Sequence, residues 1–414
     1  MNRRYYCFDI VLVSPLSLSS GLSENTDQDV LLDSRDKPYI PATSIAGVLA
    51  SRLGKKEKER LYGKIADEYS EKSHVLFYDA EYTGESGPVI SVRDSVALEE
   101  KVGKDGAKFD FEIVEPGARF KAYIELDDSV TAEDEKLIVN QLAALNSGIL
   151  RFGHKTTRGY GQVSLEKVKR RAFDDVSEWL KFDMYDEKCW ADAEAVGLDV
   201  AADDTDIIEA ELILKSALSI RSYTTEVAED GEPAHPDYKY LSLRNGKPVI
   251  PGTTWAGVFR NSVADLLGMK KMISPLIKDN FGYVEEGSGE SKKSKIAFAE
   301  SVFEDGTYEK KLLTRNSIDR FSAATNDGAL YTELTMYGGN TRLTITLKKD
   351  TDSAVKAALI AALADLDNGF IAVGGLTAVG RGLFKVNKLR LNGEDMTEKF
   401  KAYDLKNIFG GEQD

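Results

Sequence analysis

Apolar and polar positions alternate along several segments of the chain in the manner of β-strands. Such alternation, with a period of two, places one set of side chains on a single face of a sheet. The segments also contain many β-branched and aromatic residues, and turn-forming residues bound them. The strands predicted in this way are residues 5–13, 75–80 and 162–165 in the first half of the chain, and residues 207–215, 294–299 and 383–386 in the second half.

Apolar residues that recur every three or four positions predict helices between these strands. In residues 353–367, Val355, Leu359 and Leu363 fall on one face of such a helix. Other helices are predicted after a Pro-x-Ile-Pro turn, where a threonine or serine is an N-cap signal. The predicted helices are residues 43–53 and 132–146 in the first half, and residues 253–267 and 353–367 in the second half.

The predicted elements occur twice because the sequence repeats itself. Three blocks recur in the same order, and this predicts two copies of one domain rather than a single large fold. The repeated blocks are residues 38–48 and 248–258 at an offset of 210, residues 93–117 and 315–339 at an offset of 222, and residues 148–161 and 369–382 at an offset of 221.

Each copy is expected to form an α+β domain. The order strand, helix, β-rich insertion, strand, helix, loop, strand is that of the ferredoxin-like or split βαβ arrangement, which is RRM-like. The sheet of such a domain is a common RNA-binding platform. Within the insertion, an Asp-Gly pair twelve residues after Arg93 or Arg315 predicts a hairpin-like finger. The predicted boundaries are residues 1–172 for the first domain, 173–208 for an acidic linker, 209–392 for the second domain and 393–414 for a C-terminal tail.

The composition limits the classes of protein that the chain can belong to. Of its 414 residues, 42% are hydrophobic and 30% are charged, which is typical of an ordinary globular protein. The sequence has no apolar run of about 20 residues and no signal-like N-terminus, so we expect no membrane partner and a cytoplasmic location. Only Cys7 and Cys189 are present, which excludes a disulfide framework and a cysteine-rich zinc site, so no zinc is expected.

The acidic charge is concentrated in one segment. The net charge is −15, but residues 173–208 alone hold twelve acidic and two basic residues, a net charge of −10. Residues 393–414 hold six acidic residues and three lysines. The two repeats are therefore close to neutral, and either of them could carry a basic groove for nucleic acid.

One carboxylate is retained in an otherwise divergent loop. Asp27 and Asp237 both lie eleven residues before the proline that opens the Pro-x-Ile-Pro turn, at Pro38 and Pro248. Such an aspartate can simply form a turn. It can also activate a nucleophile or bind a divalent ion beside a phosphodiester. The residues alone leave both interpretations open.

Hydroxyls, glycines and cations elsewhere in the repeats are candidates for binding phosphates. A helix N-terminus presents free N–H groups and the positive end of the helix dipole, and glycine-rich loops can cradle a phosphate. Plain helix capping and ordinary surface arginines are the alternatives. The candidates are Thr43, Ser44, Thr253 and Thr254 at the helix starts, Lys155, Arg158 and Arg381 in the glycine loops, Arg93, Arg315 and Arg320 in the fingers, and Arg260. Of the three histidines, His74, His154 and His235, none has a counterpart in the other copy, so a histidine acid–base pair is not supported.

The combined motifs resemble the RAMP superfamily of CRISPR-associated proteins. The specific matches are the Pro-x-Ile-Pro helix start, the finger at Ile318-Asp319-Arg320 and the loop ending in Arg158-Gly159-Tyr160-Gly161. The sequence is most similar to the backbone subunits of type III effector complexes, and the tandem pair resembles the fused subunits of type III-D systems. The resemblance covers nearly all of both repeats but not the acidic segment or the tail.

The resemblance implies a fused double subunit that binds a CRISPR guide RNA along a palm. A β-hairpin thumb, here at about 93–106 and 315–328, would flip out a base pair, and an aspartate with Mg²⁺ or another divalent cation would cut the complementary single-stranded target RNA. The matching aspartates are Asp27 and Asp237, as catalytic residues and metal ligands. Other subunits of a type III complex are the implied partners. The first copy departs from the family in having Val96-Ala97-Leu98 where Ile-Asp-Arg is usual, and Ala42 where glycine is usual.

Two other functions remain open at this point. In one of them the chain is a non-catalytic scaffold for guide RNA. In the other it is a metal-independent nuclease that processes the guide, which the unpaired histidines disfavour. A ferredoxin-like enzyme that does not act on RNA is a more distant alternative.

Overall fold

The computed structural model describes the chain apart from residues 1, 20, 22–25, 66–69, 85–88, 100–101, 200–204, 224–235, 270–273, 286–289, 327–329, 405–407 and 410–414. It divides into two compact units, which are described separately. Unit 1 comprises Met1–Thr156 and Tyr160–Asp203, and unit 2 comprises Thr157–Gly159 and Asp204–Asp414. Among the described residues, no helix has the length and apolar character needed to cross a membrane.

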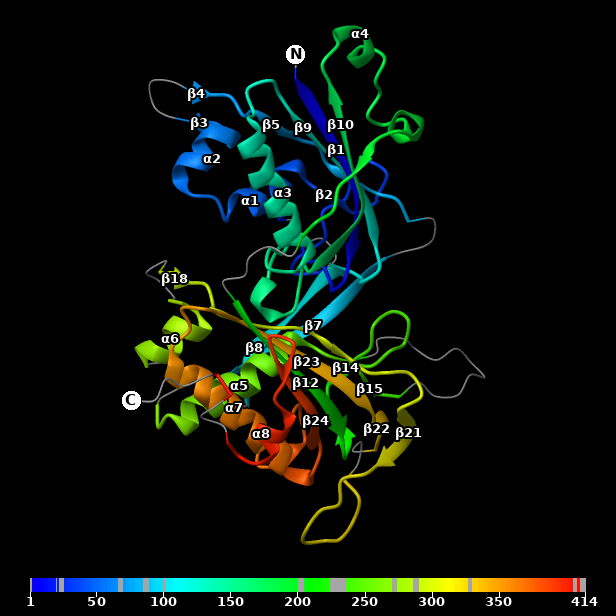
Figure 1. Cartoon of the computed structure of the whole chain (residues 1–414). Helices are drawn as coiled ribbons and strands as arrows, with labels where there is room; N and C mark the ends of the chain where they lie inside the picture. The colour runs from blue at the N-terminus through cyan, green and yellow to red at the C-terminus, as the bar shows by residue number, and fades with distance from the viewer. Residues whose placement is uncertain are drawn as a thin grey trace. The chain divides into compact units, whose positions relative to one another are not determined.

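Unit 1 combines one large sheet with helices on both of its faces (Figure 1). Its elements are β1 (Arg3–Leu12), β2 (Tyr39–Ile40), α1 (Ala42–Ala50), α2 (Lys55–Tyr62), β3 (Lys64–Ile65), β4 (Ser70–Glu71), β5 (Val75–Phe77), β6 (Ala80–Tyr82), β7 (Ile90–Glu99), β8 (Val102–Val114), β9 (Arg119–Leu126), α3 (Ala132–Asn146), β10 (Val163–Phe173), α4 (Val176–Trp179), the 3-10 turn η2 (Glu187–Trp190) and β11 (Glu194–Ala195). The 3-10 turn η1 (Thr156–Arg158) begins at the last residue before the break in unit 1, and its other two residues are assigned to unit 2.

The sheet of unit 1 has the strand order β11-β10-β1-β9-β6-β2, with β5 also paired to β9. Strands β10, β9 and β5 run antiparallel to their neighbours. Alternate residues of β1 point to opposite faces, as the sequence pattern predicts. Helices α1, α2 and α3 cover one face, and their apolar side chains complete its core. The core includes Tyr6, Phe8, Ile10 and Leu12 of β1, Ile45 and Leu49 of α1, Leu61 of α2, and Ile138 and Leu142 of α3.

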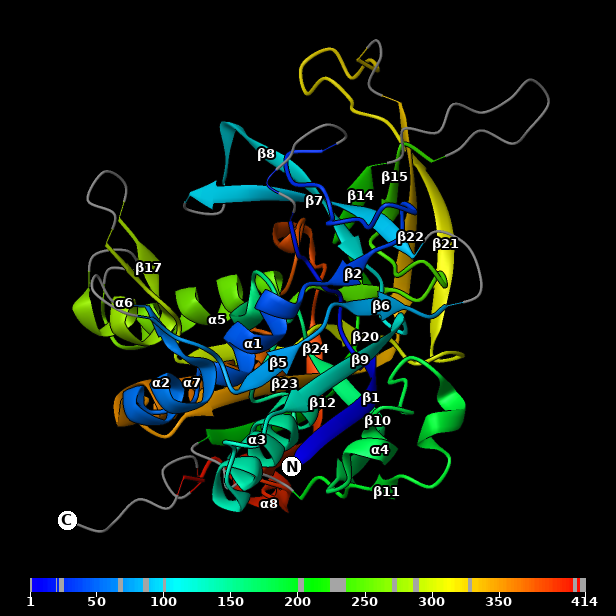
Figure 2. The same ribbon diagram turned by 90° about the horizontal axis from the view of Figure 1, so that it is seen from above.

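The opposite face of this sheet is covered by the acidic segment, which the sequence analysis treats as a linker. Residues 174–199 turn back after β10, form α4 and η2, and pair β11 with β10. Their aromatic side chains pack on aromatic residues of the sheet, and Figure 2 shows α3 on one side of β1 and β10 and α4 on the other. The resulting outer cluster contains Tyr5, Cys7, Tyr123, Phe173 and Trp190, with Trp179, Phe182 and Met184 packed against it.

This covering segment is amphipathic. Trp179 donates a hydrogen bond from Nε1 to the Tyr5 hydroxyl at 2.8 Å, and Trp190 donates one to the Met184 carbonyl at 2.8 Å. All nine acidic side chains between residues 174 and 199 are exposed. The segment therefore belongs to unit 1, where it encloses an aromatic sheet face behind an acidic surface.

Unit 2 has a five-stranded main sheet, with helices α5 and α7 packed in one core against it, and a second sheet. Its elements are β12 (Thr205–Leu214), β13 (Ala217–Leu218), β14 (Arg221–Tyr223), β15 (Tyr238–Tyr240), β16 (Val249–Ile250), α5 (Gly252–Leu266), α6 (Pro275–Phe281), β17 (Tyr283–Val284), β18 (Ser291–Lys292), β19 (Ile296–Phe298), β20 (Ser301–Val302), β21 (Tyr308–Arg315), β22 (Tyr331–Gly338), β23 (Asn340–Lys348), α7 (Ser353–Asn368), the 3-10 turn η3 (Thr377–Val379), β24 (Phe384–Leu391), β25 (Glu394–Asp395) and α8 (Thr397–Lys401).

The main sheet of unit 2 has the order β19-β23-β12-β24-β25, and a second sheet has the order β13-β22-β15-β14, with β21 paired to β22. Strand β12 alternates strictly between buried and half-buried residues. Its inward residues meet Trp255, Phe259 and Val263 of α5 and Leu359 and Leu363 of α7 in the core. On the outward face, side chains of neighbouring strands form ion pairs: Glu209 pairs with Arg342 at 3.6 Å and Glu211 with Arg390 at 3.0 Å.

The C-terminal segment of unit 2 packs on the same side of its sheet as the helices. The covering segment of unit 1, by contrast, packs on the face opposite the helices. Phe400 of α8 is buried in the main core of unit 2. Lys401 pairs with Asp367 at 3.0 Å, and the hydroxyl of Tyr403 donates to Asn368, so this segment packs beside the end of α7.

The positions of the main elements agree with the sequence analysis, but two details are wrong. Helix α3 has the predicted bounds, and α7 ends one residue later than predicted. The N-caps of α1 and α5 are Pro41 and Pro251, without a side-chain cap, so the predicted threonine caps are wrong. In unit 1 the Asp-Gly pair at 105–106 lies inside β8 rather than at the turn of the hairpin. The matching pair at 327–328 lies outside the described residues.

Candidate functional site

Asp27 of unit 1 lies on the surface against the β7–β8 hairpin. The Asp110 main-chain N–H donates to Asp27 Oδ2 at 3.0 Å, and the Asp27 N–H donates to Asp110 Oδ1 at 3.1 Å. Two residues further along β8, the Glu112 N–H donates to the Gln28 carbonyl at 2.9 Å. The Glu112 side-chain oxygen Oε2 accepts from the Val30 N–H at 2.9 Å. The loop that carries Asp27 is therefore attached to the returning strand of the hairpin.

Asp237 of unit 2 has the same arrangement. The main-chain N–H of Thr332 donates to Asp237 Oδ2 at 2.6 Å, and the Thr332 hydroxyl donates to the same oxygen at 3.1 Å. The Asp237 N–H donates to Thr332 Oγ1 at 3.2 Å. These hydrogen bonds from the Thr332 main chain and hydroxyl lower the pKa of Asp237 from its usual value, so the carboxylate stays ionised.

The two sites are equivalent in the repeat, since Asp110 and Thr332 are separated by the offset of 222 that relates the hairpin blocks. Both aspartates are exposed, and each lies where the hairpin leaves the body of its unit. An ionised carboxylate is a weak general base but a suitable ligand for a hard cation. The sequence analysis missed Asp110 and Thr332. The signal that could have identified them is an oxygen-bearing side chain at the same point of both repeats.

The donor set fits a divalent cation that is shared with a substrate. Mg²⁺ is commonly held by one or two carboxylates together with phosphate oxygens and water. Unit 1 offers the exposed carboxylate of Asp27 for this purpose, and unit 2 offers that of Asp237. Within the described part of the chain, no group of three or more His, Cys, Asp or Glu residues is arranged to hold a metal ion. A cation here would therefore need further oxygen ligands, such as those of a bound phosphate and water.

The helix starts are less open to phosphate than the sequence suggests. In unit 1 the first helical N–H, that of Ala42, donates to Asp79 Oδ1 at 2.7 Å, so a carboxylate occupies part of this helix N-terminus. Thr43 is exposed and Ser44 is half-buried. In unit 2, Thr253 and Thr254 are both half-buried. The hydroxyls of these helix starts remain predictions as RNA ligands.

The glycine loops use their glycines for internal packing. The N–H of Gly161 donates to the Pro15 carbonyl at 2.8 Å, and the N–H of Gly382 donates to the Ala217 carbonyl at 2.8 Å. Both glycines have φ of +75°, and a Cβ would lie 1.8 Å from the Phe152 carbonyl oxygen at Gly161 and 1.9 Å from the Val373 carbonyl oxygen at Gly382. Only glycine fits such a position. These N–H groups therefore bind the protein backbone rather than a phosphate.

Two of the predicted phosphate ligands in these loops have partners on the hairpins. Arg381 is 3% exposed and donates from both terminal nitrogens to Glu333, at 2.7 and 2.8 Å. The ammonium of Lys155 lies 2.9 Å from the ring centroid of Phe111, a cation–π geometry. Both side chains attach a glycine loop to a hairpin strand.

The remaining predicted cations divide between interior and surface. Arg93 of β7 is 3% exposed. Arg260 of α5 is half-buried, and this burial lowers the pKa of its guanidinium. Arg315 at the end of β21 is half-buried, whereas Arg158 and Arg320 are exposed. Exposure therefore favours Arg158 and Arg320 as phosphate ligands over Arg93.

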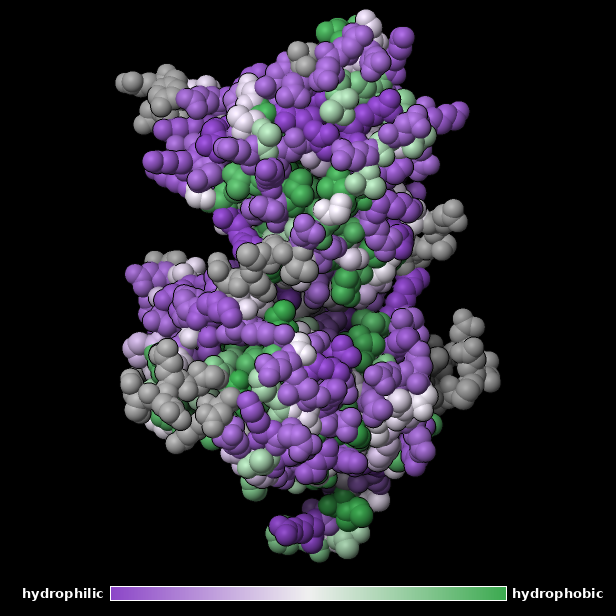
Figure 3. All heavy atoms as spheres, viewed as in Figure 1, coloured by the Kyte–Doolittle hydropathy of each residue, from purple (hydrophilic) through white to green (hydrophobic). Residues whose placement is uncertain are grey.

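The hairpin of unit 2 ends in an ordered apolar tip. Asp319 Oδ1 accepts from the main-chain N–H groups of Phe321 and Ser322, at 3.0 and 2.7 Å, and from the Ser322 hydroxyl at 2.8 Å. This turn leaves Ile318 64% and Phe321 98% exposed. The tip projects at the bottom of Figure 1, where Figure 3 shows hydrophobic atoms on the surface. In unit 1 the side chains of residues 96–99 and 102–108, which include Val96 and Val102, lie outside the described part.

Aromatic and basic side chains surround Asp237 on the second sheet of unit 2. The guanidinium of Arg221 lies 4.6 Å from the ring centroid of Tyr238, and the rings of Tyr238 and Tyr331 meet edge to face at 6.0 Å. Such combinations of rings and cations are typical of surfaces that bind single-stranded nucleic acid. The sequence analysis missed this group because its members come from three separate strands.

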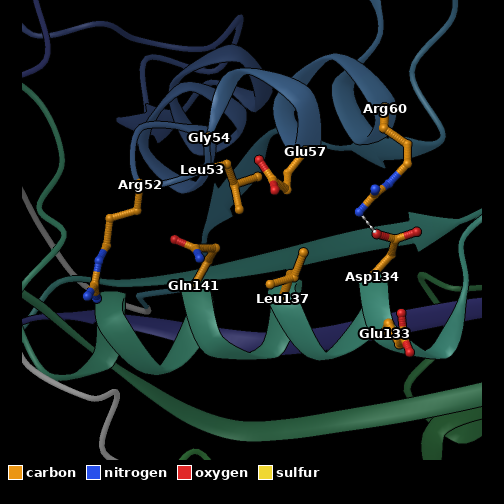
Figure 4. A pocket seen from close by; sticks show the side chains of 9 residues that line it. All are labelled: Arg52, Leu53, Gly54, Glu57, Arg60, Glu133, Asp134, Leu137 and Gln141. Carbon is orange, nitrogen blue, oxygen red and sulfur yellow. Dashed lines mark hydrogen bonds and ion pairs between the residues drawn. The ribbon is translucent and has the colours of Figure 1, made fainter.

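A surface pocket of about 470 Å³ in unit 1 lies apart from these residues, between α3 and the region of α1 and α2 (Figure 4). It is crossed by the ion pair of Arg60 and Asp134. The hydroxyl of Thr131, the N-cap of α3, donates to Asp134 Oδ2 at 2.9 Å and accepts from the Asp134 N–H at 3.1 Å, so this acid is part of the local structure. The pocket is lined by Arg52, Leu53, Gly54, Glu57, Arg60, Glu133, Asp134, Leu137 and Gln141, none of which the sequence analysis selects.

His74 has a structural role, since its Nδ1 lies 2.9 Å from Asp127 Oδ2. His154 is exposed, and His235 lies outside the described residues.

One comparison with known proteins identifies both halves of the chain. The model of the RAMP superfamily matches residues 9–164 and 211–385, which is most of the sequence. The two matched regions are the two repeats, and each contains one of the carboxylate–hairpin sites. No curated protein matches the sequence.

Proposed function

Because the chain belongs to the RAMP superfamily, we propose that it is a fused double backbone subunit of a type III CRISPR effector complex, of the III-D kind, that binds guide RNA and cleaves complementary target RNA. We also infer that each unit is ferredoxin-like. The strand orders β10-β1-β9-β5 and β24-β12-β23-β19, with two helices on one face, support this inference.

One observation carries the proposal of cleavage. In both units an exposed aspartate is held at the base of a projecting hairpin by hydrogen bonds to equivalent residues. A hairpin that separates bases of a guide–target duplex would bring the neighbouring target phosphate to this aspartate. Since the chain holds one such site in each unit, the proposal predicts two cuts in each bound target.

The chemistry requires a target 2′-hydroxyl in line with its own phosphate. Asp27 and Asp237 would hold a divalent cation that stabilises the developing charge on the phosphate. The chain itself binds and orients the strand. In unit 2 the rings of Tyr238 and Tyr331 provide a surface for stacking bases, and the exposed Arg320 provides charge at the hairpin tip.

The covered sheet of unit 1 supports an RNA path away from that face. An RRM-type platform binds bases on exposed aromatic residues of its sheet. Here Tyr5, Tyr123 and Phe173 lie beneath the acidic covering segment. RNA on unit 1 is therefore expected to follow the hairpin side, where Asp27 lies.

The test uses the chain purified with its guide RNA and partner subunits, a labelled complementary target and Mg²⁺. Asp27→Asn and Asp237→Asn should each lower the rate of one of the two cuts by at least about a hundredfold, while target binding is retained. Asparagine keeps the size of the side chain and one oxygen acceptor for the hairpin N–H, so it separates lost charge from lost structure. Asp36→Asn, at an exposed aspartate of the same region, is the matched control.

A non-catalytic scaffold is the second candidate, because the hydrogen bonds of both aspartates also explain them as structural residues. If the asparagine variants leave both cuts unchanged, or if the wild-type complex binds target without cutting it, the scaffold function stands and cleavage by these residues does not. Cutting that persists in EDTA would contradict the proposal that a divalent cation takes part in cleavage.

A further inference from the structure

We infer that Asp110 and Thr332 are positioning residues, which fix the carboxylates of Asp27 and Asp237 relative to the hairpin so that cutting depends on the hairpin position. This inference rests on the proposed function and adds to it the residues that control each cut. Both residues lie in the repeated blocks 93–117 and 315–339, but neither is among the candidate site residues predicted from the sequence.

The same pair of contacts is made with different chemistry in the two units. In each unit a main-chain N–H of the hairpin donates to the aspartate, and a side-chain oxygen of the same hairpin residue accepts the aspartate N–H. That oxygen belongs to a carboxylate in Asp110 and to a hydroxyl in Thr332. Since both satisfy the same geometry, the common requirement is an oxygen acceptor at this point of the strand.

The position of these residues links them to the hairpin tip. Thr332 is the second residue of β22, directly opposite Thr314 of β21, at the point where the hairpin leaves the sheet. Strand β15, which begins directly after Asp237, also pairs in parallel with β22, Tyr238 opposite Glu333 and Lys239 opposite Leu334. A displacement of the hairpin by bound RNA would therefore carry β15 and the carboxylate of Asp237 with it.

Fixing the carboxylate has a kinetic consequence. An exposed aspartate samples several rotamers, and ordering it in advance removes an entropic cost from the reaction. In unit 2 the carboxylate loses one of its two hairpin donors if the Thr332 hydroxyl is removed. A hydrogen bond to a charged group is worth enough to change a rate by roughly tenfold.

The variant Thr332→Val tests this, because valine keeps the shape of threonine and the main-chain N–H but lacks the hydroxyl. In single-turnover assays of the whole guide-loaded complex, the cut that Asp237→Asn abolishes should slow roughly tenfold. Target affinity and the other cut should not change. Thr332→Ser should restore the rate, and Thr314→Val, the same substitution directly across the hairpin, should have no effect.

The exchange Asp110→Thr provides an independent arm in unit 1. It should retain the cut that depends on Asp27, because threonine performs this role in unit 2, whereas Asp110→Val should slow it. This arm also decides the question if Thr332→Val fails to fold. The inference is overturned if valine at either position leaves the corresponding cut at the wild-type rate, or if both cuts and target binding fall together. A cut that survives Asp237→Asn would instead overturn the proposed function.

Discussion

The two units place an ion pair at the same point with opposite polarity. In unit 1, Arg4 of β1 pairs with Glu135 of α3 at 3.0 Å. In unit 2, Asp206 of β12 pairs with Lys356 of α7 at 2.8 Å. The strand positions are equivalent, since Arg4 lies opposite Leu126 and Asp206 opposite Leu347 in the paired strands. The fold therefore requires a strand–helix contact between opposite charges there, but not a particular sign on either element.

The junction between the glycine loop and the hairpin shows a larger exchange. In unit 1, Tyr160 meets Phe111 with ring centroids 6.1 Å apart. In unit 2, the equivalent positions hold Arg381 and Glu333, which form a buried ion pair. Both residues of the pair have changed together, from two rings to two charges. The two units therefore share a backbone framework at this junction, but their side chains make contact by different interactions.

The largest expected effect comes from breaking that buried ion pair. Glu333→Ala should destabilise unit 2 by about 3–5 kcal/mol, because it leaves the guanidinium of Arg381 buried without its carboxylate. Hydrogen–deuterium exchange, measured peptide by peptide, would show the loss of protection in unit 2 and an unchanged unit 1. The double variant Glu333→Phe with Arg381→Tyr, which copies unit 1, should recover most of the loss. An equal loss in the single and double variants would contradict the equivalence of the two junctions.

A smaller loss of stability is expected when the outer face of the unit 1 sheet is uncovered. Among the described residues, only unit 1 covers this face with aromatic side chains. Trp190→Ala should cost unit 1 about 3 kcal/mol, because the indole is buried against Tyr123 and Phe182. Urea denaturation followed by circular dichroism would measure it. On the open face of unit 2, where Arg342 is exposed, Arg342→Ala should change stability by less than about 1 kcal/mol. Comparable losses in the two variants would mean that the covering segment contributes little.

The smallest of the three effects on stability appears only at low pH. Burial alone would raise the pKa of Asp206, but its ion pairs with Lys349 and Lys356 lower it to about 2. Because the unfolded value is about 3.9, the contribution of about 2.5 kcal/mol is complete above that pH and is lost as the pH falls from about 4 to about 2. Protection of unit 2 against hydrogen exchange should fall in this window. Asp206→Asn should remove that part of the pH dependence, and its persistence would show that another group is responsible.

The sequence predicts the main helices well and the candidate ligands poorly, for a physical reason. Helix α3 follows from a local pattern of apolar residues, so its bounds can be read from neighbouring positions. The burial of Arg381 depends on Glu333, which lies 48 residues away in sequence and approaches only after folding. The threonine cap of α1 failed because Asp79, from a distant loop, supplies the oxygen instead.

The acidic covering segment was misread for a similar reason. Its charge suggested an acidic linker, and its aromatic residues are too widely spaced to form a periodic pattern. They gain a role only when the outer face of the sheet offers Tyr5 and Phe173 as partners. The aspartates, by contrast, could be selected from the sequence because the repeat supplies a second copy for comparison. Their roles in cleavage stay predictions.

The distribution of tryptophan gives the molecule a built-in optical reporter for each unit. Two of its three tryptophans, Trp179 and Trp190, lie in the covering segment of unit 1, and Trp255 lies in the core of unit 2 with its N–H on Ser301. Tryptophan fluorescence, excited selectively over tyrosine, would thus report only on unit 1 after Trp255→Phe. Removal of the other two would leave a signal for unit 2, so loading of RNA onto each half of the chain could be followed separately without a label.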